Sequence, residues 1–149
     1  MHMMEMVLAL FATVLFTSLS LTYNQAIWAQ TDYLNNATTV VQASQICHSM
    51  LDEVDAKLFA GLIDLDVESF PNESILLDLS HISAQYNVER NAVYCDQYGN
   101  PTEFVYNEEL EKDVQVPSFY IKMTVTVTGP SYLRHPYSMT RIYTKALGN

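Results

Sequence analysis

The first 60 residues of this chain contain neither glycine nor proline, and this absence constrains the fold more than any other feature. Glycine and proline are the residues that most strongly interrupt a helix. All four glycines and all five prolines lie at or beyond Gly61. We therefore predict one continuous helix from about residue 2 to about residue 60, ending near Gly61. At 1.5 Å per residue it is about 90 Å long. This exceeds the diameter of a 149-residue globule, so the helix is expected to protrude.

The predicted helix has two halves of different character. From Met6 to about Trp28 it is uncharged and largely apolar, over roughly the length that crosses a bilayer. Because this half is apolar on nearly every side, we expect it to be buried in lipid or among other helices. In the second half apolar residues recur at helical spacing, which predicts a face that packs on a domain, with Thr39 on the opposite face. The apolar positions are Ala37, Val40, Val41, Cys47, Leu51, Val54 and Leu58.

Charge is distributed unevenly along the chain. The formal net charge is −10, yet residues 1–51 carry only Glu5 and Asp32 as charged side chains. No basic patch exists to neutralise phosphates, so we expect no nucleic acid partner and no electrostatic docking on an anionic membrane surface. Glu5 lies beside the apolar run, and no Lys or Arg precedes Lys57, so we expect no side chain nearby to pair with it. An ionised carboxylate near hydrocarbon costs several kcal/mol unless something pairs with it, so Glu5 requires a specific role.

Residues 61–149 have the character of a small β-rich domain. The segment 119–128, FYIKMTVTVT, alternates strictly, and YSMTRIYTKA (137–146) returns as a further alternating strand after a hairpin loop. The segment 91–106, NAVYCDQYGNPTEFVY, predicts strand, turn and strand, and EELEKD (108–113) a polar connection. The segment 75–82, ILLDLSHI, fits a short helix or a strand equally well. We therefore predict an α+β fold with an apolar helix half (1–30), an amphipathic half (31–60) and a β-sheet head (61–149).

This organisation resembles the type IV pilin and pseudopilin superfamily. In that family a leader peptidase cuts just before an apolar helix, the new N-terminus is methylated, and the fifth mature residue is a glutamate. Met1 and Glu5 match these positions, and MVLALFATVLF (6–16) matches the apolar stretch in character. ASQICHSMLDEVDAKLF (43–59) resembles the second half of the pilin helix, and YIKMTVTVTGP (120–130) resembles late strands of pseudopilin heads. Because Glu5 replaces the positive segment of a signal peptide, we expect Met1 to be a mature N-terminus.

Two departures from the family pattern stand out. His2 occupies a position where a small hydroxyl residue is more usual. Residues 14–22 lack the glycine or proline that lets many pilin helices melt locally, and the Ser/Thr-rich FTSLSLT (16–22) loosens a helix only weakly. We therefore expect no melted segment.

The resemblance implies a structural, self-assembling protein rather than an enzyme. The expected partners are identical subunits in a helical filament, with the inner (cytoplasmic) membrane holding the chain before assembly and the cell surface as its final, extracellular location. The implied assembly residues are Met1, Glu5, Phe11, Phe16, Leu21 and Trp28. We expect the last four to be exposed on the helix of an isolated subunit and buried between subunits. Glu5 would pair with the methylated amine of its own or a neighbouring subunit; the alternative is an interfacial glutamate on an ordinary membrane anchor. Two other functions remain open: a minor pseudopilin, or a membrane-anchored extracellular binding module.

Export of the head would also permit a disulfide between Cys47 and Cys95. Cys47 lies on the apolar stripe of the helix, and Cys95 lies in a predicted strand just before the Gly99 turn, where a sheet would cross the helix. We predict this bond; the alternative is two buried free thiols that act as small apolar fillers.

The remaining candidate sites are weak. Asn36 and Asn72 fit the glycosylation sequon, and Asn72 is better placed because it lies in a proline-containing loop. His48 and Asp52 have the spacing of an ion pair on a helix surface rather than a metal site. The acidic run at Asp64, Asp66 and Glu68 lacks the glycine and distal glutamate of a calcium loop. No catalytic or phosphate-binding motif occurs, so we predict no metal, no cofactor and no enzyme activity.

Overall fold

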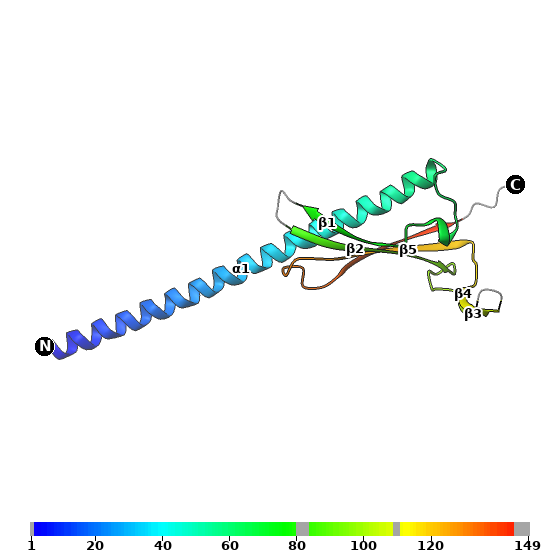
Figure 1. Cartoon of the computed structure of the whole chain (residues 1–149). Helices are drawn as coiled ribbons and strands as arrows, with labels where there is room; N and C mark the ends of the chain where they lie inside the picture. The colour runs from blue at the N-terminus through cyan, green and yellow to red at the C-terminus, as the bar shows by residue number, and fades with distance from the viewer. Residues whose placement is uncertain (1, 80–83, 109–110, 145–149) are drawn as a thin grey trace. The chain divides into compact units, whose positions relative to one another are not determined.

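The computed structural model describes residues 2–79, 84–108 and 111–144, and it divides the chain into two compact units, Met1–Thr38 and Thr39–Asn149. One helix, α1 (His2–Phe59), runs unbroken through the first unit and into the second (Figure 1). The predicted continuous helix without a melted segment is therefore confirmed, as is the α+β fold of a long N-terminal helix with a small antiparallel sheet.

The helix ends at Phe59, close to Gly61 as the sequence predicts. Gly61 has φ of 67°, a left-handed conformation that glycine adopts without steric cost. The backbone N–H of Gly61 donates to the Leu58 carbonyl at 3.1 Å, and that of Leu62 donates to the Lys57 carbonyl at 2.9 Å. These two hydrogen bonds form a Schellman motif, which satisfies the last helix carbonyls.

The second unit, which we call the head (residues 39–144 as described), contains a four-stranded antiparallel sheet. Its strand order is β1 (Ser74–Leu79), β2 (Ala84–Cys95), β5 (Tyr120–Thr128) and β6 (Tyr137–Thr144). A short 3₁₀ helix, η1 (Val67–Ser69), precedes β1. The predicted strands at 119–128 and 137–146 correspond to β5 and β6. The ambiguous segment 75–82 is a strand as far as Leu79, and its remainder lies outside the described residues.

A separate two-stranded sheet corrects one detail of the prediction. The strands expected within 91–106 exist, but β3 (Phe104–Asn107) pairs with β4 (Lys112–Gln115), and not with β2. The turn between β2 and β3 is closed by Asp96, whose Oδ1 accepts the backbone N–H groups of Tyr98 and Asn100 at 2.8 and 2.9 Å. The expected polar connection 108–113 therefore includes the first two residues of β4.

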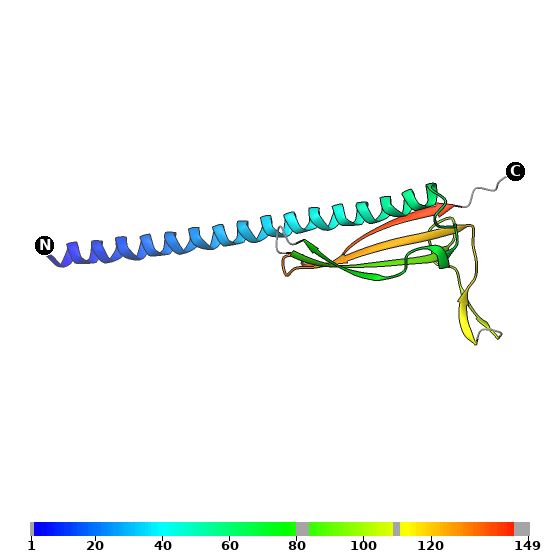
Figure 2. The ribbon, with the colours of Figure 1, turned by 45° about the horizontal axis from the view of Figure 1, so that its top comes forward.

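The head core lies between one face of the four-stranded sheet and residues 39–59 of α1, as the two views in Figures 1 and 2 show. Alternate residues of β5 are buried, which confirms the predicted alternation, and the same holds for β2 from Tyr86 to Ala92. The helix buries Thr39, Ala43, Cys47, Leu51 and Val54. Our stripe was thus wrong at three positions: Thr39 faces the sheet, Val41 is 56% exposed, and Ala37 is exposed as well. The sheet selects one face of α1, and Ala43 on that face is flanked by Thr39 and Cys47 one turn away on each side.

Polar contacts show that the strands run along this helix segment. The Tyr86 hydroxyl donates to Gln42 Oε1 at 2.6 Å, and four residues later Arg90 contacts Glu53 at 3.4 Å. Four strand residues span about 13 Å, and the eleven helix residues from Gln42 to Glu53 span about 16 Å, so the two directions nearly coincide.

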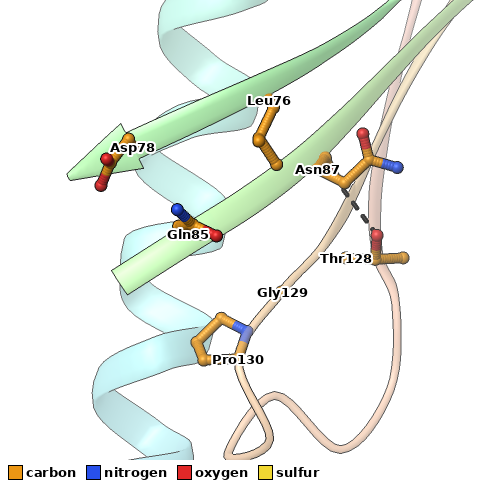
Figure 3. Close-up of a pocket in the computed structure, with 7 residues that line it drawn as sticks. All are labelled: Leu76, Asp78, Gln85, Asn87, Thr128, Gly129 and Pro130. Carbon is orange, nitrogen blue, oxygen red and sulfur yellow. Dashed lines mark hydrogen bonds between the residues drawn. The ribbon is translucent and has the colours of Figure 1, made fainter. Parts of the chain in front are cut away.

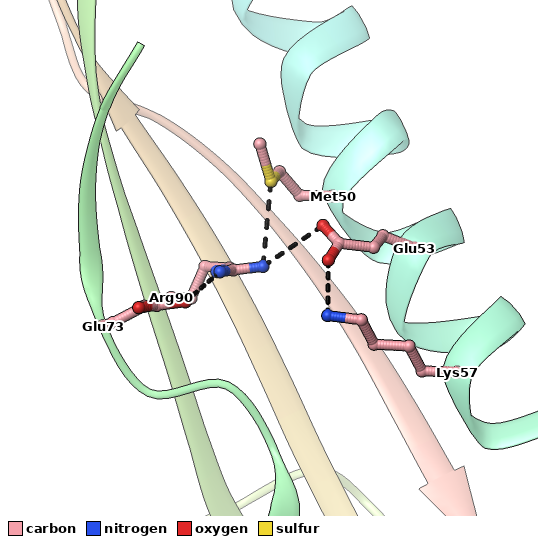
Figure 4. A network of polar contacts seen from close by, with 5 residues as sticks. All are labelled: Met50, Glu53, Lys57, Glu73 and Arg90. Carbon is pink, nitrogen blue, oxygen red and sulfur yellow. Dashed lines mark hydrogen bonds and ion pairs between the residues drawn. The ribbon is translucent and has the colours of Figure 1, made fainter. Parts of the chain in front are cut away.

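Arg90 is a buried charge that the sequence did not reveal. Its side chain is only 4% exposed and faces α1, where it pairs with Glu53 and with Glu73 in the segment before β1 (Figure 4). Its guanidinium also lies 3.9 Å from the Met50 sulfur. Lys57 donates to Glu53 at 2.6 Å, and this hydrogen bond is the main cause that lowers the pKa of Glu53. The network links helix, sheet and loop in one cluster of charges.

Candidate functional site: the exposed N-terminal helix

Every described side chain from His2 to Leu34 is exposed to solvent within this chain. Of the predicted assembly residues, Phe11, Phe16, Leu21 and Trp28 have exposed fractions between 59% and 75%. Soluble monomers rarely leave so large a contiguous apolar surface bare, so these residues require lipid or other protein chains around them. The first part of the prediction, exposure on a single subunit, is confirmed; Met1 lies outside the described residues.

By length and composition, α1 is the one helix in the described part of the chain that is able to cross a membrane, and none of its most apolar window is buried within the chain. The threonines of α1 suit such an environment. The hydroxyls of Thr13, Thr17 and Thr22 donate to the carbonyls of Ala9, Thr13 and Ser18 at 2.7, 2.7 and 2.9 Å. Because each hydroxyl is satisfied one turn back in its own helix, these residues need no water or partner to enter an apolar medium.

Glu5 lies in the first turn of α1, where the partial positive charge of the helix N-terminus favours a carboxylate. The structure places a neighbour beside this carboxylate: His2 Nδ1 lies 3.6 Å from Glu5 Oε2, with both side chains exposed. The expectation that no side chain near Glu5 is able to pair with it is therefore wrong, because a protonated imidazole is cationic. Side chains three residues apart are neighbours on a helix surface, so the spacing of His2 and Glu5 in the sequence already indicated this contact.

The predicted disulfide is also wrong, because Cys47 and Cys95 are both buried free thiols. The Cys47 sulfur lies 3.6 Å from the Val125 carbonyl oxygen, whereas Cys95 pairs across the sheet with Tyr120. Five strand residues separate those two positions on β5, which is about 17 Å. A disulfide requires Cα atoms within about 7 Å, so the two cysteines belong to different ends of the core. Burial raises the pKa of the Cys47 thiol to about 11.

The remaining predicted sites do not converge. Asn72 is exposed in the loop before β1, and Asn36 is half-buried within α1. Asp52 accepts a hydrogen bond from Arg141 at 3.3 Å, and Asp66 accepts one from the Tyr94 hydroxyl at 2.5 Å. Across residues 2–79, 84–108 and 111–144, no group of three or more His, Cys, Asp or Glu side chains has the arrangement of a metal site.

Among the predicted sites, only the exposed apolar surface of α1 from His2 to Leu34 has its described residues together in one continuous region of the structure. Comparison of the chain with protein-family models, with curated proteins and with solved structures finds no match. The functional argument therefore rests on the residues of α1 and on the head that they carry.

Proposed function

We propose that this chain is a structural subunit of an extracellular filament of the type IV pilus kind, held in the cytoplasmic membrane before assembly. The supporting observation is the bare apolar surface of α1 from His2 to Leu34, which includes one carboxylate at Glu5. Packing of identical helices would remove this surface from water. A filament core of this kind needs no enzyme activity and no cofactor.

Glu5 would set the register of the packed helices. A carboxylate in a low-dielectric bundle is tolerated only next to a cation, so a subunit docked at the wrong axial offset would leave it unpaired. The N-terminal amine of the same or a neighbouring subunit is the cation that we propose. His2 offers an alternative partner at 3.6 Å, so the test has to separate the two.

The experiment images the surface of cells that produce the full chain, by electron microscopy, and measures the chain in the membrane fraction. Glu5→Ala is expected to abolish filaments while the protein still inserts in the membrane, and Glu5→Gln to be nearly as harmful because charge is required. His2→Ala is expected to retain filaments, which would leave the amine as the partner. Asp32→Asn is the matched control, because Asp32 is the other carboxylate of residues 1–51 and lies on the same helix.

Normal filament yield from Glu5→Ala would remove the proposed role of Glu5. Membrane-bound wild-type protein that never forms filaments would instead favour an anchored binding module. A chain found only at filament tips would indicate a minor pseudopilin.

A further inference from the structure

The face of the four-stranded sheet that is turned away from α1 changes in character along the strands. In the middle of this face, hydroxyl and amide side chains form cross-strand rows such as Asn91, Thr124 and Thr140. At the end where β1, β2 and β5 meet the β5–β6 loop, a shallow depression of about 750 Å³ opens (Figure 3). Apolar side chains join the polar ones there, so this end of the sheet has a chemistry of its own.

Strand pairing arranges the lining of the depression in two rows. Leu76, Asn87 and Thr128 are aligned across β1, β2 and β5, and Asp78 and Gln85 are aligned in the next row. Neighbours across the strands are about 5 Å apart, and the two rows are about 7 Å apart along the strands. A single small molecule is therefore able to contact both rows at once.

The polar side chains of the depression have unused hydrogen-bonding capacity. Among the described residues, neither the Asp78 carboxylate nor the Gln85 amide has a hydrogen-bond partner. The Asn87 Oδ1 accepts a hydrogen bond from the Ser74 hydroxyl at 2.8 Å, which leaves its two amide N–H donors available. The Thr128 hydroxyl donates to the Asn87 carbonyl at 3.4 Å, and its oxygen remains an acceptor. The depression thus offers both donors and acceptors to a ligand.

Apolar surface lies directly beside these polar groups. Leu76 is 67% exposed although it lies within a strand, and Pro130 borders the depression on the side of the β5–β6 loop (Figure 3). A ligand that covers Leu76 would remove apolar area from water, which favours binding. The best match is therefore a molecule with one apolar face and several polar groups at its rim.

Charge narrows the class of ligand. Among the seven described residues that line the depression, Asp78 alone is charged, and the whole chain has a net charge of −10. An anionic ligand such as a phosphate or a uronic acid would be repelled. A cation would meet only one exposed carboxylate, and an exposed ion pair contributes little to affinity. A neutral ligand with several hydroxyl groups meets neither obstacle.

We propose that this depression binds a neutral hexose unit of a carbohydrate. A pyranose ring has a face of C–H groups and a rim of hydroxyl groups, each of which both donates and accepts hydrogen bonds. The C–H face would cover Leu76, and the rim hydroxyls would meet Gln85 and Asn87. Because an apolar ligand would leave these amides without partners, the depression selects a polyol. This inference goes beyond the filament function and does not depend on it, since a single chain contains the whole depression.

The test is saturation-transfer NMR on the full chain, solubilised in a detergent that has no sugar headgroup. The probes are glucose, galactose, mannose and N-acetylglucosamine, with glucuronate and glucosamine as charged counterparts of glucose. A single sugar in an open depression is expected to bind weakly, with a Kd of about 1–10 mM for at least one neutral probe. Saturation is expected to be strongest on the C–H protons of one ring face. Glucuronate is expected to bind roughly tenfold more weakly than glucose.

Matched variants on one sheet face locate the binding. Asn87→Ala and Gln85→Ala are each expected to lower the affinity about fivefold, because each removes a hydrogen-bonding side chain. Asn91→Ala and Thr124→Ala change the same face of β2 and β5 outside the depression and are expected to leave the affinity unchanged. Continued protection of the buried native thiols would show that each variant remains folded.

Two further variants test the apolar face and the charge separately. Leu76→Ser is expected to lower the affinity for neutral hexoses about threefold, because the C–H face loses its apolar partner. Asp78→Asn is expected to bring the affinity for glucuronate within about threefold of that for glucose, because it removes the repelling carboxylate.

Each contrary result would overturn the proposal. No saturable binding of any neutral hexose at concentrations up to about 50 mM would show that the depression is not a sugar site. Equal weakening by Asn91→Ala and Asn87→Ala would place the binding elsewhere. Glucuronate that binds the wild type as tightly as glucose would contradict the charge argument, and binding of glucosamine without any neutral hexose would assign the depression to cations.

Discussion

The buried ion pairs of Arg90 permit a prediction about the stability of the head. Removing the two carboxylate partners is expected to destabilise the head more than removing the cation. The Arg90 side chain is 4% exposed, whereas those of Glu53 and Glu73 are 42% and 58% exposed. Glu53→Gln with Glu73→Gln leaves a buried guanidinium that is unable to lose its proton, and breaking a buried pair in this way costs about 3–5 kcal/mol. Arg90→Met leaves two carboxylates that water can reach, so we expect a cost below about 1.5 kcal/mol.

A second observation supports this asymmetry. The Nε of Arg90 is buried and has no hydrogen-bond partner among the described residues. An unsatisfied buried donor costs about 1–3 kcal/mol, and Arg90→Met removes that penalty together with the ion pairs.

The buried native thiols provide the assay. Cys47 and Cys95 are inaccessible in the folded head, so their labelling in a urea series reports its unfolding in the full, detergent-solubilised chain. With a urea dependence of about 2 kcal/mol per M, the double Gln variant is expected to unfold at roughly 2 M less urea than the wild type. Arg90→Met is expected to shift by less than about 1 M. Lys57→Met, which removes a partly exposed partner of Glu53, is the control and is expected to change stability by no more than about 1 kcal/mol. A larger loss from Arg90→Met than from the double variant would refute the reasoning.

Three further predictions concern the head. Gly129→Ala would place a Cβ 2.5 Å from the buried ring of Tyr86, so we expect a loss of about 1–3 kcal/mol in the same urea assay, and an unchanged midpoint would contradict the close packing. Alkylation of the unfolded, unreduced protein is expected to add one label at each of Cys47 and Cys95, as measured by mass spectrometry. Two unlabelled cysteines would instead show that they form a disulfide. Because burial raises the pKa of Cys47 from 9.0 to about 11, the folded state keeps its thiol proton while the unfolded chain releases it. The free energy of unfolding is thus expected to fall by about 2 kcal/mol as pH rises from 9 to 11. Cys47→Ala should reduce this dependence of the free energy of unfolding on pH. An unchanged pH dependence would show that other titrating groups cause it.

The helix and the two late strands could be predicted because each depends on local properties. Absence of glycine and proline permits a helix at every position up to residue 60, and Gly61 supplies the left-handed residue that ends it. Strict alternation in 120–128 places every second side chain on one face, and that face is buried in the structure. The exposed apolar surface of α1 was predictable for the same reason, because a helix that is apolar on all sides has no polar face to present to water.

Tertiary structure decided what depends on contacts between distant residues. The sequence places Cys47 on an apolar helix face and Cys95 in a strand, but only the registers of α1 and β5 show that about 17 Å of strand separates them. The burial of Arg90 likewise arises when the sheet is laid along residues 39–59 of α1, and the sequence alone does not show that β3 pairs with β4. Local pattern specifies which elements form and which side of a strand is apolar. Which residues and strands contact one another depends on how several elements pack together in one core. The energy of such a contact depends on both residues, and these lie far apart in the sequence.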